Sequence, residues 1–379
     1  MAQLPRYVRI NVLKITLGAA ERGLKQTGHT LERPDKNRNN RYRRKKPDKK
    51  KNNRGYTRDP HIRELLCFLP KGKSDLSRIP LVLDGSLVVQ QKASCFPALA
   101  LDPPRDAHVI DACAAPGSKT SHLASLMANT GRLFAFDRSP SRLEAMQRLL
   151  AQRGVQNVRA TAGDFLEVDS NSPEYRGVTH IMLDPSCSSS GMSARPTTDP
   201  TEIAALVQNQ IRLIKHAMSF PSANAIVYST CSVHCCENEE VVEHVVAASG
   251  GRWRAVAALP WWPRRGLPPA SCAEACVRST LEDQTIGFFL CRLEKVDLAT
   301  DPGSGSSEAA AGVITTPAAA AAAAEPLPPQ TKQTKRKVKR KEAAAVVYEG
   351  GASVSEGRRK KGKKMKRRQG LAVVEEVTS

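Results

Sequence analysis

The sequence predicts an α/β fold, a mostly parallel sheet with helices on both faces, placed between residues 59 and 298. Short apolar runs, typical of buried strands, alternate there with longer segments whose apolar residues recur at helical spacing. Several of the apolar runs also end in an aspartate or a cysteine. Because parallel sheets bind ligands at the carboxyl ends of their strands, these endings predict where the functional site lies.

The expected elements follow one another along this region. Five strands are expected at "HVIDAC", "RLFAFD", "VRATAGD", "THIMLDP" and "NAIVYSTC", ending at Asp111, Asp137, Asp164, Asp184 and Cys231. Helices are expected at "SKTSHLASLMA", "SPSRLEAMQRLLAQRG", residues 201–220 and "ENEEVVEHVVAA", and a last strand at "IGFFLCRLEKV". The second helix carries ordinary boundary signals, a serine cap, a proline in its first turn and a glycine after its end.

Outside this region the chain is strongly basic. The formal net charge of the 379 residues is +21, which favours a polyanionic partner such as nucleic acid, or an anionic membrane surface. Residues 33–58 hold 13 Lys and Arg against 2 Asp and Glu, and residues 331–379 hold 16 against 5. We therefore expect a basic flexible insert at residues 33–58 and a disordered, low-complexity and basic tail at residues 299–379.

Composition also bounds the class of protein. Ten cysteines in a chain of this length do not make a disulfide-stapled scaffold, and "MAQLPRYVRI" lacks the apolar core of a signal peptide. No apolar stretch reaches the roughly 18 residues of a membrane-spanning helix. We expect a soluble intracellular protein with reduced thiols, no membrane partner and no metal site, since the cysteines show no CxxC pair. The runs "KQTKRKVKRK" and "RRKKGKKMKRR" fit nuclear or nucleolar address signals, RNA-binding arms, or a tail that only aids solubility.

The stretch "DACAAPGSKT" predicts a cofactor site. It places Gly117 in a tight loop between the first expected strand and its helix, where the backbone can approach a ligand. Asp137, at the end of the next strand, is placed to accept hydrogen bonds from ribose hydroxyls. These features fit NAD, an adenylated cofactor or S-adenosylmethionine, although neither GxGxxG nor P-loop spacing is present. In the plainer interpretation, Asp111 only caps a helix.

Together with "MLDPSCSSSGM" and "YSTCSVHCCENEEVV", this motif order resembles the Nop/Sun family of RNA cytosine-C5 methyltransferases. The stretches "LPRYVRINVLK" and "QQKASCFPALALDPP" look like that family too, and within it the likeness is to the eukaryotic ribosomal-RNA branch. The resemblance implies a Rossmann-like S-adenosylmethionine-dependent methyltransferase domain at residues 59–298. It also implies a cytosine of large-subunit ribosomal RNA as substrate, a place in the nucleus and nucleolus, contact with pre-ribosomal particles, and no DNA substrate.

The same resemblance carries the family's cofactor residues onto this chain. The loop that binds the methionine part and the adenosine corresponds to Cys113, Ala114, Ala115, Pro116, Gly117, Ser118 and Lys119. The acidic strand end corresponds to Asp137, with Arg142 in the helix beyond, and the aspartate near the adenine to Asp164. Asp184 is implied near both the reacting methyl group and the base.

The chemistry of cytosine gives the two cysteines separate roles. C5 is a poor nucleophile, and a thiolate that adds to C6 activates it, which is covalent catalysis. By the resemblance, Cys231 is the nucleophile and Cys187 assists product release, while Asp184 is the carboxylate available to N3 of the base. DNA cytosine methyltransferases use the cysteine of a Pro-Cys motif, and by that analogy Cys187 would attack instead. Either cysteine could also be only a buried, small apolar side chain.

Two departures from the family pattern stand out. The family's motif usually reads Pro-x-Cys-Ser-Gly-Ser/Thr-Gly, and here Ser189 replaces the first glycine. If this position has a positive φ, the serine costs about 1 kcal/mol and perturbs Cys187. The family also has an N-terminal RNA-binding module, of which residues 1–32 are expected to be a remnant in a truncated or divergent chain. Both departures favour an alternative function, an rRNA-binding ribosome-assembly factor with weak or lost methyltransferase activity.

Overall fold

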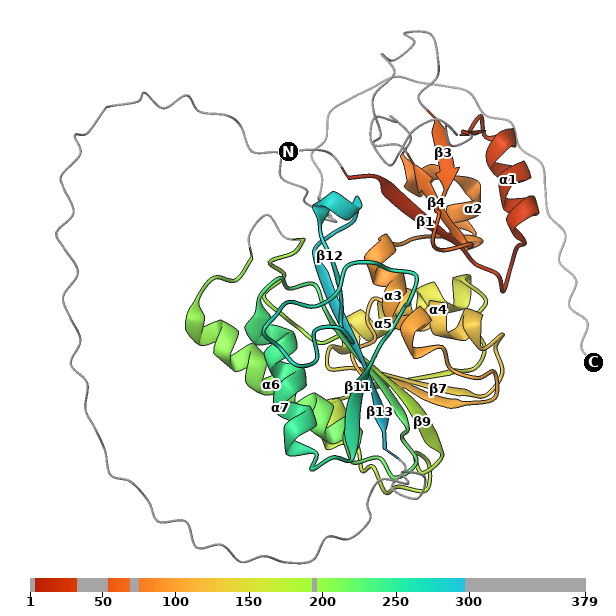
Figure 1. Ribbon diagram of the computed structural model, residues 1–379. Helices are drawn as coiled ribbons and strands as arrows, with labels where there is room; N and C mark the ends of the chain where they lie inside the picture. Colours follow the sequence, from red (N-terminus) through yellow and green to blue (C-terminus); the bar gives the residue numbers. More distant parts are fainter. Residues whose placement is uncertain (1–3, 33–53, 69–74, 193–195, 297–379) are drawn as a thin grey trace, which may run out of the picture. The chain divides into compact units, whose positions relative to one another are not determined.

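The computed structural model describes residues 4–32, 54–68, 75–192 and 196–296 (Figure 1). Most of the basic insert expected at residues 33–58, and the whole tail expected at residues 299–379, lie outside the described residues. The described part contains one sheet of five strands and one of eight. Within this part, no helix is both long and apolar enough to cross a membrane.

The larger sheet confirms the predicted fold class. Its strands are β6 His108–Asp111, β7 Arg132–Asp137, β8 Val158–Ala162, β9 Val178–Leu183, β10 Ala225–Thr230, β11 Trp253–Val256, β12 Val277–Ser279 and β13 Phe288–Lys295. They run in the order β11-β13-β10-β9-β6-β7-β8, and β12 pairs with β13. All pairs from β10 to β8 are parallel. The chain moves outward from β6 to β8 and returns to β9 on the other side of β6, so the carboxyl end of β6 is a topological switch point.

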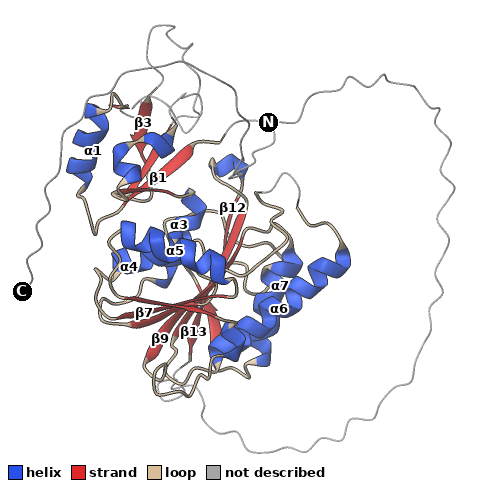
Figure 2. Ribbon diagram, turned by 180° about the vertical axis from the view of Figure 1, so that it is seen from behind, coloured by secondary structure: helices blue, strands red, loops and turns tan. Residues whose placement is uncertain are grey.

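Helices cover both faces of this sheet, as the sequence predicts (Figure 2). One face carries α3 Lys92–Leu101, α4 Ser118–Leu126 and α5 Pro140–Gln152, and the other carries α6 Pro200–Met218 and α7 Glu239–Ala248. Each interface has its own buried apolar cluster, with Leu123 and Met146 in the first and Ile214 and Val242 in the second. Because β10 is buried along its whole length, its sequence is a continuous run rather than an alternating one.

The strand pattern differs from the prediction at three places. The sequence prediction lacks β11 and β12, because strands of only four and three residues are too short to show a recognisable spacing of apolar residues. The last strand, β13, runs antiparallel to β10. The strand expected to reach Asp164 ends at Ala162, and Asp164 instead caps a short 3-10 helix. The 3-10 helices are η1 Leu76–Arg78, η2 Phe165–Glu167, η3 Cys235–Glu237 and η4 Leu281–Asp283.

The smaller sheet forms an N-terminal module with its own apolar cluster. Its elements are β1 Arg6–Ile10, α1 Leu17–Gln26, β2 Thr30–Leu31, β3 Gly55–Arg58, β4 Leu65–Phe68, α2 Pro80–Leu83 and β5 Leu87–Val89. The strand order is β2-β3-β4-β1-β5. The strand β3 falls in the segment expected to be a flexible insert, and β4 and β5 fall in the segment assigned to the catalytic domain. The sheet therefore crosses the boundary that the sequence places at residue 59.

A buried arginine joins this module to the helices of the larger sheet. Arg9 of β1 is 1% exposed, and its guanidinium donates to Ser121 Oγ of α4 at 2.9 Å and to the Ser118 carbonyl at 3.4 Å. Arg153, at the end of α5, donates to the Gly117 carbonyl at 3.1 Å and to the same Ser121 Oγ at 3.4 Å. Burial lowers the pKa of each arginine to about 10, which leaves both charged at neutral pH. Two cations thus hold the first turn of α4.

Replacing Arg9 with methionine is expected to destabilise the fold by about 2 kcal/mol, because Gln90 Oε1 loses its donor and Ser121 Oγ loses the shorter of its two arginine hydrogen bonds. Urea unfolding measures the change. The matched control is Arg148→Met, which removes an exposed guanidinium paired with Glu144 on α5 and should cost less than about 0.5 kcal/mol. Equal losses in the two variants would contradict the role given to Arg9.

Candidate active site

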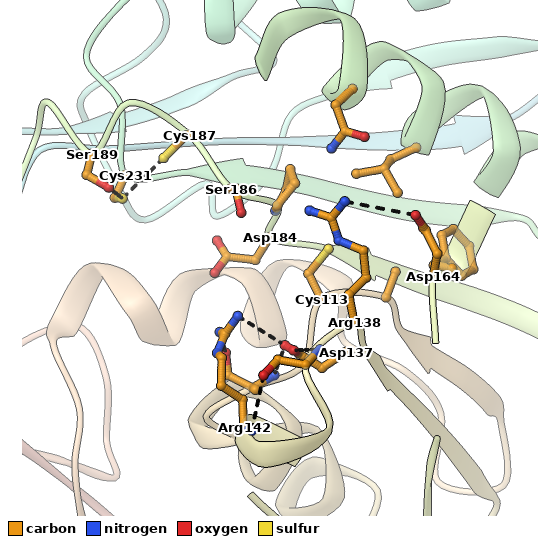
Figure 3. Close-up of a pocket in the computed structure, with 17 residues that line it drawn as sticks. Cys113, Asp137, Arg138, Arg142, Asp164, Asp184, Ser186, Cys187, Ser189 and Cys231 are labelled. Carbon is orange, nitrogen blue, oxygen red and sulfur yellow. Dashed lines mark hydrogen bonds and ion pairs between the residues drawn. The ribbon is translucent and has the colours of Figure 1, made fainter. Parts of the chain in front are cut away.

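A cavity of about 540 Å³ lies at the carboxyl ends of β6, β7, β9 and β10 (Figure 3). This is the sheet edge at which the sequence predicts the site, and the volume suits a small organic ligand. The wall consists of Ala112, Cys113, Ala115, Asp137, Arg138, Ser139, Arg142, Asp164, Phe165, Asp184, Pro185, Ser186, Cys187, Ser189, Asn209, Leu213 and Cys231.

The loop predicted to bind a cofactor connects β6 to α4 beside this cavity. Cys113 and Ala115 belong to its wall, and the rest of the loop, Ala114, Pro116, Gly117 and Ser118, lies outside the lining. Gly117 has a φ of 91°, and a Cβ at this position would lie 2.6 Å from Met146 Cγ. Glycine is therefore required for the loop to turn so close to α5.

Asp137 and Arg142 fix this loop from the neighbouring strand and helix. Asp137 Oδ2 accepts a hydrogen bond from the Ala115 amide at 3.2 Å and lies 3.5 Å from Arg142 Nη1. Arg142 Nη2 donates to the Ala115 carbonyl at 2.7 Å. Both side chains also line the cavity, so the groups that hold the loop are the groups that a ligand would meet.

Asp164 and several residues that the sequence analysis missed complete this end of the cavity. Asp164 caps η2, accepting from the Leu166 amide at 3.0 Å, and its second oxygen lies 4.0 Å from Arg138. Arg138 directly follows Asp137 at the end of β7, so its position in the sequence could have identified it as a residue of the cavity wall. Asn209 and Leu213 come from α6, whose periodic pattern marks them only as helical.

Asp111 ends β6 but does not line the cavity. It is 1% exposed, and its Oδ2 accepts a hydrogen bond from Thr120 Oγ of α4 at 2.8 Å. Burial raises its pKa to about 7. The residue at the N-cap of α4 is Gly117, so Asp111 does not cap the helix and instead holds it through the hydrogen bond from Thr120.

Two sulfur atoms meet at the other end of the cavity. Cys187 lies in the loop after β9, Cys231 directly follows β10, and their Sγ atoms are 3.2 Å apart (Figure 3). The Gly191 amide donates to the Cys231 carbonyl at 2.8 Å, which ties the first loop to the second. A Cβ on Gly191 would lie 2.3 Å from the Gly287 carbonyl, so this loop packs backbone against backbone.

A buried carboxylate supports the loop that carries Cys187. Glu237 of η3 is fully buried, and its Oε1 accepts from the Ser188 amide at 3.0 Å and from Gln210 Nε2 at 3.1 Å. Its backbone carbonyl accepts from the Tyr228 hydroxyl at 2.6 Å. Although burial opposes ionisation, the donors from Ser188 and its neighbours hold the pKa of Glu237 below its usual range. The charged carboxylate fixes the loop through hydrogen bonds rather than through an ion pair.

The two thiols differ sharply in acidity. The hydrogen bond from Cys187 lowers the pKa of Cys231 to about 7, and Ser189 and Lys119 contribute in the same direction against burial and Asp184. The same hydrogen bond, together with burial, raises the pKa of Cys187. When the pair loses a proton near neutral pH, the charge therefore falls on Cys231 and the remaining proton stays on Cys187. Since the thiolate is the nucleophilic form, the geometry favours Cys231 as the attacking group.

Asp184 is held between a cation and a hydroxyl next to this pair. Lys119 Nζ lies 2.7 Å from its Oδ2, and Ser229 Oγ donates to its Oδ1 at 2.7 Å. Burial alone would lower the pKa of Lys119, but Asp184 outweighs this effect and raises it. Lys119, carried over as a cofactor residue, thus contacts the residue carried over as the catalytic carboxylate.

Ser189 meets the condition under which a glycine would be preferred. Its φ is 57°, in the left-handed region that L side chains seldom adopt. Its Oγ accepts a hydrogen bond from the Cys231 thiol at 3.6 Å. The substitution therefore places a hydroxyl against the thiol expected to attack.

Comparison with known proteins fits this geometry. The family described as 16S rRNA methyltransferase RsmB/F matches residues 98–255, and the ferredoxin-like domain of NOL1/NOP2/Sun domain family member 5 matches residues 4–90. A 26S rRNA (cytosine-C(5))-methyltransferase of Caenorhabditis elegans is 35% identical over 304 residues, which cover 78% of this chain and 68% of that protein. The chain belongs to the Nop/Sun family of RNA cytosine-C5 methyltransferases. Within the family it falls in the eukaryotic ribosomal-RNA branch.

A further relative and two solved structures extend the likeness. A 28S rRNA (cytosine-C(5))-methyltransferase of Mus musculus is 39% identical over 308 residues, and the match spans 64% of that longer protein. A methyltransferase homologue from Pyrococcus horikoshii superposes with a TM-score of 0.63 at 27% identity, covering 78% of this chain and 88% of that one. The structure of NSun6 from Pyrococcus horikoshii with SFG superposes with a TM-score of 0.59 at 24% identity and 77% coverage of this chain, which shows the shared fold.

Alkylation should detect the acidic thiol directly. The rate at which iodoacetamide modifies Cys231 is expected to rise with pH through a midpoint near 7, since the thiolate is the reactive form. Peptide mass spectrometry after timed labelling between pH 5 and 10 measures this profile. Cys113 is the internal control, because burial raises its pKa and should leave it unlabelled at pH 8. A Cys231 midpoint near 9, that of an ordinary thiol, would refute the assignment.

Proposed function

We propose that this protein transfers a methyl group from S-adenosylmethionine to C5 of a cytosine in large-subunit ribosomal RNA. The carrying observation is the sulfur pair beside Asp184, in one cavity with Asp137 and Arg142. The mouse and nematode relatives, named as 28S and 26S rRNA (cytosine-C(5))-methyltransferases, support the choice of substrate.

The end of the cavity around Asp137 suits the cofactor. When bound, S-adenosylmethionine supplies an electrophilic methyl group. Asp137 offers a carboxylate for the ribose hydroxyls, as strand-end acids of such sheets do, and Asp164 with Phe165 offers a carboxylate and a ring for the adenine. Cys113 and Ala115 provide small side chains along the loop, so a ligand can approach its backbone.

The end of the cavity around the sulfur pair suits the base. In the first step the Cys231 thiolate forms a bond to C6, and the electron pair of the C5=C6 bond becomes available at C5, which takes the methyl group. Asp184 is the carboxyl group placed to protonate or hydrogen bond N3 of the pyrimidine, where negative charge accumulates, and it must carry a proton to donate there. Lys119 and Ser229 hold Asp184 in place for this task.

The second cysteine acts when the product leaves. A base removes the proton from C5, the C5=C6 bond forms again, and the C6–S bond breaks with its electron pair returning to Cys231. Cys187, whose pKa is raised, keeps its proton at neutral pH and is 3.2 Å from the departing sulfur. It therefore stabilises the leaving thiolate by donating a hydrogen bond and is unsuited to act as the attacking group of a DNA-type mechanism.

We also propose that the protein works on pre-ribosomal particles in the nucleus, at the nucleolus, with the basic segments adding salt-sensitive affinity for RNA. The alternative function is a ribosome-assembly factor with weak or lost activity. One observation favours it, the serine at a position with a φ of 57° in the motif that carries Cys187.

Adduct trapping tests the roles of the cysteines. With S-adenosylmethionine and fragments of large-subunit rRNA, Cys187→Ala should accumulate a covalent protein–RNA adduct, because it removes the donor to the leaving thiolate and slows release. Cys231→Ser should form no adduct and transfer no methyl group. A denaturing gel and incorporation of labelled methyl groups measure the two outcomes. Cys236→Ser, a change outside the cavity wall, is the control and should behave as the wild type.

An adduct that depends on Cys187 instead would reverse the two roles and support the DNA-type mechanism. Wild-type protein that neither methylates RNA nor forms adducts would favour the assembly-factor alternative.

A further inference from the structure

Ser189 is a residue of the cavity wall that lies against the nucleophile and has no role in the reaction described above. It holds the backbone conformation that glycine adopts most easily, and Gly191 two residues later shows that this loop does accept glycine. A serine without a role would strain the backbone at this position and stabilise nothing. The contacts of its side chain indicate what that role is.

The four serines around the sulfur pair divide into two groups. Ser188, Ser190 and Ser232 bond one another at 3.1 to 3.2 Å and form a closed cluster behind the loop. Ser189 takes no part in these hydrogen bonds, and its Oγ lies 3.6 Å from Cys231 Sγ in the cavity wall (Figure 3). The contact of its hydroxyl is thus with the sulfur and not with the serine cluster.

We propose that the Ser189 hydroxyl is a second hydrogen-bond donor to the Cys231 sulfur and shares with Cys187 the task of stabilising the departing thiolate. The proposal rests on the proposed function. While Cys231 is a thiol, Ser189 Oγ accepts a hydrogen bond from it, and once the sulfur is charged the hydroxyl rotates and donates one instead. No proton is transferred, so the step needs no further reactant.

The charged groups around Cys231 make a neutral hydrogen-bond donor important for stabilising its thiolate. The titratable groups that face the sulfur are Cys187 in the β9 loop, Asp184 at the end of β9 and Lys119 on α4. Asp184 disfavours the thiolate, and its charge is partly offset by Lys119 at 2.7 Å. Neutral donors that touch the sulfur therefore decide how well a negative charge is held, and the wall supplies one on each side, at 3.2 and 3.6 Å.

The first test is the pH profile of alkylation at Cys231 in two variants. Ser189→Ala keeps the strained backbone and removes the hydroxyl, whereas Ser189→Gly removes both. If the hydroxyl is the donor, both variants shift the midpoint upward by about 0.5 to 1 pH unit, the range expected for one neutral hydrogen bond. Ser172→Ala, in the connection between β8 and β9, is the control and should not shift it. Midpoints that stay at the wild-type value in both variants overturn the proposal.

The second test measures release. In the adduct assay the double variant Cys187→Ala, Ser189→Ala should hold roughly three- to tenfold more adduct at steady state than Cys187→Ala alone, because both side-chain donors are then gone. Equal amounts of adduct would show that Ser189 has only a structural role. The two tests separate the proposal from the proposed function, since alkylation needs neither RNA nor cofactor. A chain that forms no adduct but shows the alkylation shift retains the hydrogen bond and loses the reaction.

Discussion

Parallel pairing of β9 with β10 brings the two sulfur atoms of the site together. Leu183 pairs with Tyr228, so both strands end close to the same level, and the chain continues from them into Asp184 and toward Cys231. Two residues that lie 44 positions apart in sequence thereby approach to 3.2 Å. The fully buried Glu237 then fixes one loop through the Ser188 amide, and Gly191 ties that loop to the Cys231 carbonyl. A shift of either strand would separate the sulfurs.

The contact also decides which sulfur carries charge. Burial penalises a thiolate on either cysteine, and two adjacent thiolates would repel each other, so the pair holds one charge and one proton. The hydrogen bond from Cys187 favours the thiolate of Cys231 most, and the Ser189 hydroxyl and Lys119 add to it, so the charge falls on Cys231. The sequence motifs alone leave both cysteines eligible, and the difference comes from neighbours that the fold supplies.

Local patterns in the sequence were enough to predict the central strands, their helices and the edge at which the site lies. The apolar runs that become β6, β7, β9 and β10 are buried on both faces, so each is recognisable without its partners. The position of β5 in the N-terminal sheet depends on its pairing with β1, as in Val8 with Val89, and the periodicity of a local segment carries no information on such distant pairing.

Some residues of the site could be predicted from local sequence patterns, and others depend on contacts between elements that are distant in sequence. The strand-end aspartates and both cysteines follow from motif and position. The ion pair of Lys119 with Asp184, the cavity lining by Asn209 and the aim of the Ser189 hydroxyl depend on how elements pack. Side-chain direction at such positions is set by tertiary contacts, which a single sequence does not display.

The arginine pair at the start of α4 has a consequence for modularity. Arg9 comes from the N-terminal module, yet two of its acceptors, Ser121 Oγ and the Ser118 carbonyl, belong to the helix that follows the Gly117 loop. A cut after β5, between the two sheets, would remove one of the two cations that hold that turn and expose apolar surface. The larger sheet therefore depends on the smaller one for its stability, and it is a poor choice for expression alone or for recombination with another N-terminal module.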